Sequence, residues 1–487
     1  MKKRIKNILT KNWFFLLFLI IGVFLRLYRL EEFITFLGDE GRDAIIIKRI
    51  ITFEHFPALG PVSSVGQVFL GPFFYYLKAP FLALFKLNPV GLAFGSAFYS
   101  TIGLIFVYFI LKKINKNTAY IFLVLATFSW VLIHNARFSW NPNLLPYFSF
   151  FTLYFTSLFF EKNLYFPFFA GMFFSFSTQL HYLAFLLTPT FLFFILFNYK
   201  KVLKDFFLFL KKIFLFFTGF IIFYLPLILF EIKNNFLNTK NFIRLFTEEK
   251  IIQSVSYFYR FQETLINFFN FIFNLKINYF FGILIFVFIF LYFFAKKFLN
   301  RKPLLHIVFL SFFIYILSFS ALNSFRFYHY YNVLYLNFFI ILAIILTDFF
   351  SLNFLSKLFV LIFLIFFINQ NRLNYPFRHP QGNFQTKIAQ KIAQSIIDNN
   401  PKLPYQIVPI PSTETDSHIR YYLEIMGKRP LAEGSPQEGQ ELYVLCYEKE
   451  CDVLNHPQWQ IASFKNKKID KIWKVDRVKI YKIIHGN

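Results

Sequence analysis

The sequence predicts a polytopic all-α membrane protein with about 11 transmembrane helices, followed by a small C-terminal α/β domain. Composition is the first observation behind this class, because 57% of the 487 residues are hydrophobic and the mean hydropathy is +0.52, as in membrane proteins. The second is a series of apolar runs whose lengths approach the ~20 residues that a helix needs to cross a bilayer. These runs cover roughly residues 12–29, 89–111, 118–134, 144–160, 164–180, 183–198, 211–230, 278–295, 304–321, 332–349 and 354–369.

The basic residues predict the orientation of the chain. The formal net charge is +26, and many of the positive charges lie in short clusters beside apolar runs, at 2–11, 112–116, 200–212 and 296–302. Basic residues beside spans mark the cytoplasmic side, so the charge needs no nucleic acid as a partner. We therefore expect a multi-pass protein of the cell membrane with a cytoplasmic N-terminus. Every polar motif described below then falls on the extracytoplasmic side.

The loops on that side predict the rest of the architecture. The first outer loop, 30–88, is too long for a connector, and its segments 42–54 and 70–86 have the length and apolar faces of helices lying along the outer membrane surface. The loop 231–277 is similar but more polar. Apolar spans stop near residue 370, which divides the chain into a membrane domain, 1–370, and an outer soluble domain, 371–487.

The soluble domain shows mixed periodicity. An amphipathic segment at 384–397 and a helix at 417–426 accompany short runs of strand character at 405–410, 441–446 and 478–484. The only two cysteines, Cys446 and Cys451, lie in this region. Their spacing indicates neither a metal site nor a disulfide framework, and leaves an isolated bridge open.

A cluster of charge stands at the start of the first outer loop, where Gly38-Asp39-Glu40-Gly41-Arg42-Asp43 follows the first span. One interpretation is structural, with Asp39 capping a helix that continues through 44–51. The other is chemical, since charged groups at a membrane surface are costly unless they serve a function. Asp39 is then a candidate general base; apolar surroundings would raise its pKa and Arg42 would oppose that change. Glu40, its neighbour, points in a different direction.

Three further polar clusters interrupt the spans on the same side. The segment 134–143 reads as a polar turn with an Asn cap before Pro142, but its arginine, Arg137, suits a phosphate. The break at 178–182 contains a histidine typical of a span end. The segment 323–331 combines tyrosines of an aromatic belt with an arginine, which is unusual on the outer side and suits an anionic lipid phosphate. The candidate residues in these clusters are Arg137, Asn141, Asn143, His181, Arg326 and Tyr330.

An acidic pair after the first span, amphipathic helices in the first outer loop, about eleven spans and an outer soluble tail together resemble the GT-C superfamily of membrane glycosyltransferases. The nearest likeness is to the glycosyltransferase family 39-like branch, which holds the protein O-mannosyltransferases and the lipid A aminoarabinose transferases. Asp39 matches the family's acid that acts on the acceptor, and Arg42 matches a frequent arginine three residues later. The resemblance covers residues 1–370.

The sequence also departs from that family. The second outer-loop element resembles 137–143 but lacks the acid often found there, with Asn141 or Asn143 near its place. A lysine-containing element that grips the donor phosphate corresponds best to 71–76, where the lysine is missing. The run 326–330 is similar to the family's arginine and tyrosine element. The missing acid argues against a shared metal site, so no cofactor is implied as required, although a divalent cation stays open.

The resemblance implies transfer of a hexose or pentose from a polyprenyl-phosphate carrier to a hydroxyl of a protein, lipid or glycan acceptor, on the extracytoplasmic side and with inversion. Asp39 and Glu40 would be catalytic. Asp43, Asn141 and Asn143 would position the acceptor or sugar. Binding of the donor phosphate or substrate would fall to Arg42, Arg137, His181, Arg326 and Tyr330.

The alternative function is a transporter or flippase of lipid-linked sugars without transferase chemistry. Such proteins commonly contain paired half-repeats and interrupted helices with ionisable residues at mid-membrane depth. Here the spans are nearly free of acids, and the polar groups gather at one face. No Gly-rich phosphate loop is present to support ATP-driven transport. The pattern therefore favours the enzyme.

Overall fold

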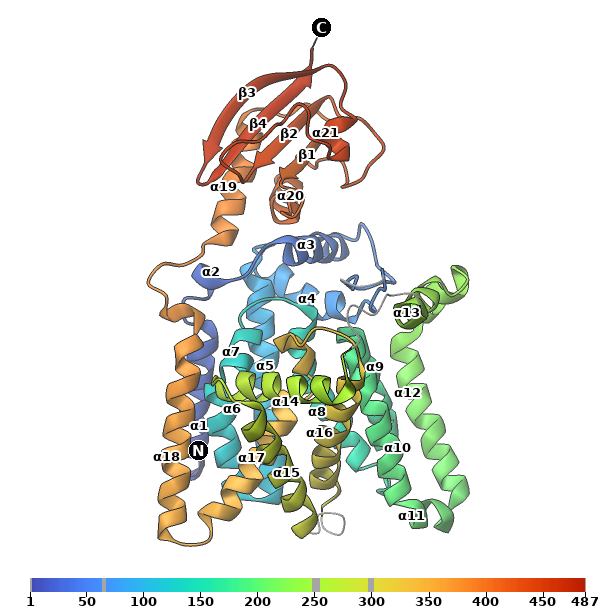
Figure 1. Ribbon diagram of the computed structural model, residues 1–487, viewed down its shortest axis with the longest axis vertical. Coiled ribbons are helices and arrows are strands. Elements are labelled where there is room, and N and C mark those ends of the chain that lie inside the picture. Colours follow the sequence, from blue (N-terminus) through green and yellow to red (C-terminus); the bar gives the residue numbers. More distant parts are fainter. Residues whose placement is uncertain (1, 64–66, 248–254, 297–301, 487) are drawn as a thin grey trace.

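The computed structural model describes residues 2–63, 67–247, 255–296 and 302–486. A bundle of helices forms one end of the molecule and a domain with a four-stranded sheet forms the other (Figure 1). Short helices of the first outer loop lie between them. The charged segment 38–43 therefore lies at the junction of two differently built parts.

The apolar runs form the helices of the bundle. Among the described residues, four helices are long and apolar enough to cross a membrane: α5, α12, α16 and the helix that begins with α18. Several expected runs form shorter helices; the run 118–134, for example, is divided at Ser129. The total of about eleven spans stays a prediction. The bundle comprises α1 Lys2–Leu27, α5 Val90–Ile114, α6 Lys116–Phe128, α7 Trp130–Asn135, η1 Asn141–Leu144, α8 Leu145–Ser157, α9 Tyr165–Leu180, η2 Tyr182–Leu187, α10 Thr188–Phe197, α11 Tyr199–Lys204, α12 Phe206–Lys233, α15 Tyr279–Ala295, α16 Pro303–Ala321, η4 Tyr328–Tyr331, α17 Tyr335–Phe350 and α18 Phe354–Asn371.

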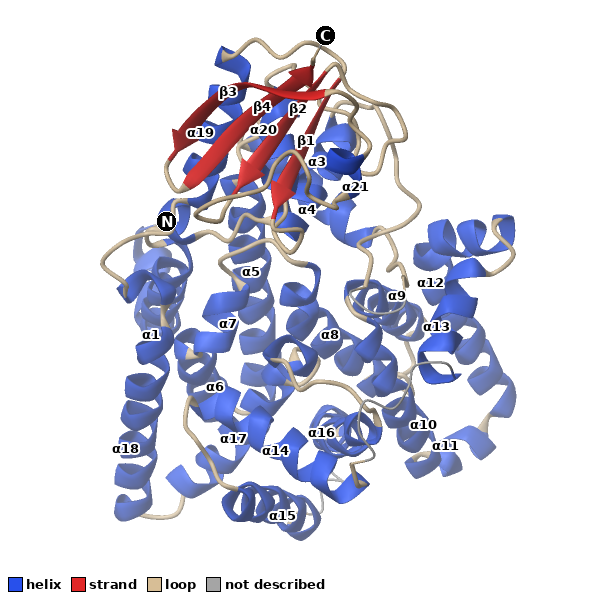
Figure 2. Cartoon of the chain, turned by 45° about the horizontal axis from the view of Figure 1, so that its top comes forward, coloured by secondary structure: helices blue, strands red, loops and turns tan. Residues whose placement is uncertain are grey.

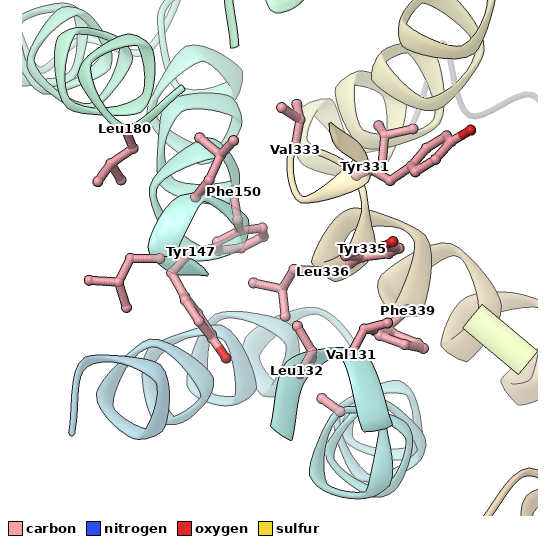
Figure 3. Close-up of a cluster of buried hydrophobic side chains, with 14 of the residues drawn as sticks. Val131, Leu132, Tyr147, Phe150, Leu180, Tyr331, Val333, Tyr335, Leu336 and Phe339 are labelled. Carbon is pink, nitrogen blue, oxygen red and sulfur yellow. The ribbon is translucent and has the colours of Figure 1, made fainter. Parts of the chain in front are cut away.

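The core of the bundle forms around α17, which packs against α6, α8 and α16. Its side chains are apolar on every face and most are buried, as expected for a helix surrounded by others. Figure 3 shows part of this core, where Tyr335, Leu336 and Phe339 face side chains of α7 and α8. Elsewhere Gly171 of α9 and Gly219 of α12 let two helices approach closely, because a Cβ on either glycine would lie within about 2 Å of a backbone oxygen of the other helix.

The expected helices of the first outer loop are present. They are α3 Gly38–Ile51 and α4 Phe73–Leu84, preceded by the short α2 Leu30–Phe33. We expected these helices to lie on the membrane surface, but α3 is covered by α4 on one side and by α20 of the soluble domain on the other. The loop 231–277 also contains helices, α13 Leu237–Thr247 and α14 Tyr257–Phe273, and α14 lies across the bundle (Figure 1).

The soluble domain confirms the predicted mixture of helices and strands. Its sheet has the order β1-β2-β4-β3, with β1 and β2 parallel and the other pairs antiparallel (Figure 2). The three predicted strands are present, and a fourth, β3, was missed. A disulfide joins Cys446 to Cys451. The elements are η5 Arg372–Asn374, η6 Pro376–Arg378, α19 Gln385–Asp398, β1 Tyr405–Ile410, α20 Ser417–Ile425, β2 Glu441–Cys446, α21 Trp459–Ala462, β3 Lys467–Val475 and β4 Val478–His485.

The soluble domain is fixed to α3 by close packing and by charge. A Cβ on Gly41 would lie 2.3 Å from the backbone nitrogen of His418, so only glycine permits this approach of α3 to α20. At the other end of α3, the guanidinium of Arg49 lies 2.8 Å from the buried carboxylate of Glu424. Lys48 and Arg429 also pair with Glu424. These contacts join the soluble domain to α3.

Candidate active site

A cavity of about 700 Å³ opens between the helical bundle and the soluble domain. The bundle side consists of the N-terminus of α3, the residues around the end of α7, and η4. The other side, here called the domain wall, consists of Thr413, Glu414, Thr415, Ser417 and Glu433 of the soluble domain. The remaining lining residues are Thr35, Leu37, Gly38, Asp39, Glu40, Arg42, His134, Phe138, Trp140 and Tyr328.

The N-terminus of α3 separates the two neighbouring acids. The helix begins at Gly38, and the side chain of Glu40 reaches back to accept a hydrogen bond of 3.1 Å from the backbone nitrogen of Leu37. Glu40 therefore caps the helix, a task that one interpretation of the sequence gave to Asp39. Asp39 stays at the cavity with its side chain 52% exposed, where an incoming molecule can reach it.

Arg42 links Asp39 to a second, buried acid. Its Nη1 lies 3.0 Å from Oδ1 of Asp39, and its Nη2 lies 2.8 Å from Oδ1 of Asp43. The hydroxyl of Tyr75 also donates to Asp43, at 3.2 Å. Oδ2 of Asp43 is buried and has no hydrogen-bond partner in the described structure. Asp43 therefore holds Arg42 from beneath, and Arg42 holds Asp39 at the cavity.

Burial changes the acidity of two of these carboxyl groups. It raises the pKa of Glu40 to about 7, and the negative charges of Asp39 and Asp43 act in the same direction. Burial also raises the pKa of Asp43 to about 6, against the opposing effect of Arg42. Glu40 at the cavity and Asp43 beneath it are thus buried carboxyl groups with raised pKa values, and such groups are common at sites of acid and base chemistry.

Arg137 lies apart from this group. It is buried, and its Nη1 and Nη2 donate to the backbone oxygens at the end of α1, including those of Leu25 at 3.1 Å and Tyr28 at 2.8 Å. Phe377 packs on the face of the guanidinium. Because a helix C-terminus has carbonyls without partners in the helix, Arg137 satisfies the C-terminal end of α1. Arg137 does not line the cavity.

Arg326 is also directed at the protein. Its Nε donates to the hydroxyl of Thr264 at 2.8 Å, and its other nitrogens donate to the backbone oxygens of Leu322 and Ser324. The guanidinium lies over the ring of Phe319. These contacts join α14 to the end of α16. The structure does not bring Arg326 to the cavity.

His181 and Tyr330 lie nearer to the cavity. Their ring centroids are 5.4 Å apart, and both rings contact His329. His329 in turn packs edge-on against Trp140, which lines the cavity. The predicted residues His181 and Tyr330 are therefore separated from the cavity by an aromatic layer.

Asn141 and Asn143 are buried beneath the cavity. The amide of Asn141 donates to the backbone oxygen of Leu180 at 2.7 Å, and that of Asn143 donates to the oxygen of Phe138 at 3.1 Å. Oδ1 of Asn143 has no partner in the described structure. Both residues shape the turn that places Phe138 and Trp140 at the cavity.

Several lining residues were not singled out from the sequence. His134 and Trp140 lie within a polar cluster that was recognised, and His134 contacts the hydroxyl of Tyr328 at 3.3 Å. The domain wall had no readable signal, because its residues reach the cavity only when the soluble domain folds back onto α3. Among the described residues, no group of three or more His, Cys, Asp or Glu side chains is arranged to hold a metal ion.

Comparisons with known proteins show which families and folds this chain is similar to. The model of the family described as dolichyl-phosphate-mannose-protein mannosyltransferase matches residues 70–225. No curated protein matches the sequence. Two solved structures of ArnT from Cupriavidus metallidurans, one in the apo state and one bound to undecaprenyl phosphate, each have a TM-score of 0.62 at 14% identity, covering 97% of this chain and 98% of ArnT.

A third structure shares the fold over a smaller part of its length. It is the archaeal oligosaccharyltransferase AglB from Archaeoglobus fulgidus, in complex with an inhibitory peptide and a dolichol-phosphate, with a TM-score of 0.55 at 14% identity. The match covers 87% of this chain and 65% of AglB. With the apolar helices, this fold indicates a multi-pass membrane protein. The resemblance inferred from the sequence is confirmed: the chain has the fold of the GT-C membrane glycosyltransferases.

Proposed function

We propose that the protein is a membrane glycosyltransferase that moves a sugar from a polyprenyl-phosphate carrier to an acceptor hydroxyl, with Asp39 as general base. The observation that carries this proposal is the cavity itself, in which an accessible carboxylate is held by Arg42 at the meeting point of the bundle and the soluble domain. The fold supports it, because ArnT has been solved with undecaprenyl phosphate and AglB with dolichol-phosphate.

In the proposed reaction, Asp39 accepts the proton of the acceptor hydroxyl. The hydroxyl oxygen forms a bond to the anomeric carbon as the bond from that carbon to the phosphate oxygen breaks. The phosphate leaves with its polyprenyl chain. Attack from the face opposite the phosphate inverts the configuration. The reaction would take place on the extracytoplasmic side, with the N-terminus in the cytoplasm. The site would lie between the membrane domain, 1–370, and the soluble domain, 371–487.

The remaining residues have proposed roles that follow their positions. Arg42 is the arginine at the cavity, so it would stabilise the charge that develops on the leaving phosphate. Glu40 fixes the start of α3 and thereby the direction of Asp39. His181 and Tyr330 would contribute to phosphate binding through the layer around Trp140. Arg137 and Arg326 would support the site through the helix ends that they bind.

The test compares Asp39→Asn with the wild type in purified protein supplied with a panel of polyprenyl-phosphate sugars. We expect the variant to lose turnover by at least about 100-fold while donor binding is kept. Glu450→Gln, which changes an exposed carboxylate outside the cavity, is the control and should be fully active. Full turnover by Asp39→Asn would refute the proposed base. Wild-type protein that moves these lipids across liposome membranes without any transfer would support the transporter instead.

A further inference from the structure

The domain wall adds hydroxyl and carboxylate groups to the lining of the cavity. It contains three hydroxyl groups, from Thr413, Thr415 and Ser417, and two exposed carboxylates, from Glu414 and Glu433. These residues come from the loop between β1 and α20, from the first residue of α20, Ser417, and from the loop before β2. They face a cavity whose other side holds the proposed base. An acceptor that reaches Asp39 must therefore pass beside or rest on these groups.

The position of the domain wall is fixed relative to Asp39. Besides the contact at Gly41, a Cβ on Gly38 would lie 2.7 Å from Cγ2 of Thr415, so the wall touches the residue that precedes Asp39. Helix α20 begins within the wall, at Ser417, and packs along α3. The wall is thus part of the same rigid contact that positions α3. Its groups lie at the cavity without a movement of the domain.

The lining of the cavity is acidic although the whole chain is basic. Four carboxyl groups line it, those of Asp39, Glu40, Glu414 and Glu433, against one guanidinium, that of Arg42. Arg42 is already paired with two acids. In the described parts of the chain, the ion pairs between Lys or Arg and an acid do not include Glu414 or Glu433. The formal net charge of the chain as a whole is +26, so the lining of the cavity has the opposite sign to the whole chain.

We propose that the domain wall is the acceptor subsite, and that its acceptor carries a positive charge, such as a protonated amine, beside the hydroxyl that receives the sugar. This inference rests on the proposed function. The donor carries an anionic phosphate and would occupy the bundle side, next to Arg42. Glu414 and Glu433 attract a cation and repel an anionic acceptor. The three hydroxyl groups can bond to a polar acceptor in either direction.

The first test measures the charge preference of the wall without any substrate. Thr413→Cys places a thiol on the wall, and both native cysteines are joined in a disulfide. The labelling rates of a trimethylammonium and a sulfonate methanethiosulfonate of equal size are compared in the full-length protein, with Gln394→Cys on exposed α19 as reference. We expect the cation-to-anion rate ratio to be about tenfold higher at position 413. Equal ratios would overturn the inference.

Paired substitutions test whether the two carboxylates of the wall cause this preference for the cationic reagent. Glu414→Gln combined with Glu433→Gln should lower the rate ratio at position 413 several-fold. The matched control combines Glu448→Gln with Glu450→Gln, two exposed carboxylates of the same domain that do not line the cavity. This control should leave the ratio unchanged. An equal effect of both pairs would mean that only the overall charge of the domain is measured, and would overturn the inference.

The second test uses the transfer assay. Methyl glucosaminide should compete with the acceptor about tenfold more strongly than its N-acetylated form, because only the former carries a positive charge. The Glu414→Gln and Glu433→Gln pair should remove this difference, whereas the Glu448→Gln and Glu450→Gln pair, which lies outside the cavity, should keep it. Equal competition by an active enzyme would overturn the inference alone. A cation preference in labelling, in protein that transfers no sugar from any donor, would refute the proposed function and leave a cation-binding wall.

Discussion

Arg42 donates two hydrogen bonds to the buried carboxylate of Asp43, from Nη2 at 2.8 Å and from Nε at 3.0 Å. Only one of its nitrogens is left for Asp39, at 3.0 Å. The side chain of Asp43 is 1% exposed, whereas that of Asp39 is 52% exposed. The guanidinium is therefore held firmly by the protein on one side and presents the proposed base on the other.

The first prediction separates these two contacts. Arg42→Gln leaves the buried Asp43 without its cation, so we expect a loss of about 3 kcal/mol in stability at pH 7 together with a fall in turnover. Adding Asp43→Asn removes the unpaired charge and should recover most of the stability but not the turnover. The measurements are the apparent thermal midpoint in detergent and the rate of sugar transfer. A double variant that regains turnover would exclude a direct role for Arg42.

The second prediction concerns pH. The pKa of Glu40 is raised from its ordinary value of 4.5 to about 7, so the folded protein binds more protons here than the unfolded chain. Stability from this group is therefore complete below about pH 4.5 and is lost as the pH rises to about 7, by at most about 3 kcal/mol. Glu40→Gln keeps an acceptor for Leu37 and should flatten this decline in thermal midpoint. The pKa of Asp43 is also raised, so its contribution to the pH dependence of stability has the same sign. Because the wild type and Glu40→Gln both contain Asp43, this contribution cancels when the two are compared. Identical pH slopes for variant and wild type would contradict the raised pKa.

The sequence identified the elements but not all of their neighbours. The acid cluster, the outer-loop helices and three strands were predicted, because local periodicity and charge at a helix start are properties of a few adjacent residues. β3 was missed because five of the nine residues in Lys467–Val475 are charged, four lysines and one aspartate, and the strand is half exposed. The domain wall was missed for another reason. Glu414 reaches the cavity only through the contact of α20 with α3, which brings together residues that are some 375 positions apart in the sequence.

The same distinction applies to the arginines. A membrane-protein sequence marks an arginine on the outer side as unusual, but it does not say whether a ligand or the end of a helix uses it. The structure places Arg42 at the cavity and directs Arg137 and Arg326 at backbone oxygens. Carbonyls at helix ends and phosphate oxygens accept the same kind of hydrogen bond. Only the arrangement of the chain distinguishes them.

The third prediction tests this distinction at Arg137. Arg137→Gln removes the charged donors from the end of α1, so we expect the stability to fall by about 3 kcal/mol, seen as a lower thermal midpoint. The KM for the polyprenyl-phosphate donor should stay unchanged when turnover is expressed per folded molecule. By contrast, the donor KM should rise in Arg42→Gln when its stability is restored by Asp43→Asn. A large rise in donor KM for Arg137→Gln would assign Arg137 to the phosphate after all.

The fourth prediction concerns the contact between the two domains. Gly41→Ala would place a methyl group 2.3 Å from the backbone nitrogen of His418. Because that neighbour is backbone and cannot rotate away, α20 must shift from α3, at a cost of about 1–3 kcal/mol. The shift also moves the domain wall away from Asp39, so turnover should fall together with the thermal midpoint.

Gly282→Ala is the matched control, since it too replaces a glycine within a helix. Its added methyl group would lie 3.6 Å from Ile266 and 4.0 Å from Leu265, both of which are ordinary contacts. The gain in helix propensity is up to about 1 kcal/mol for either substitution, so Gly282→Ala should be neutral or slightly stabilising and fully active. Limited proteolysis supplies a third measurement: cleavage between α18 and α19 should become faster in Gly41→Ala than in the control. Equal behaviour of the two variants would mean that the site does not depend on the close approach of α20 to α3.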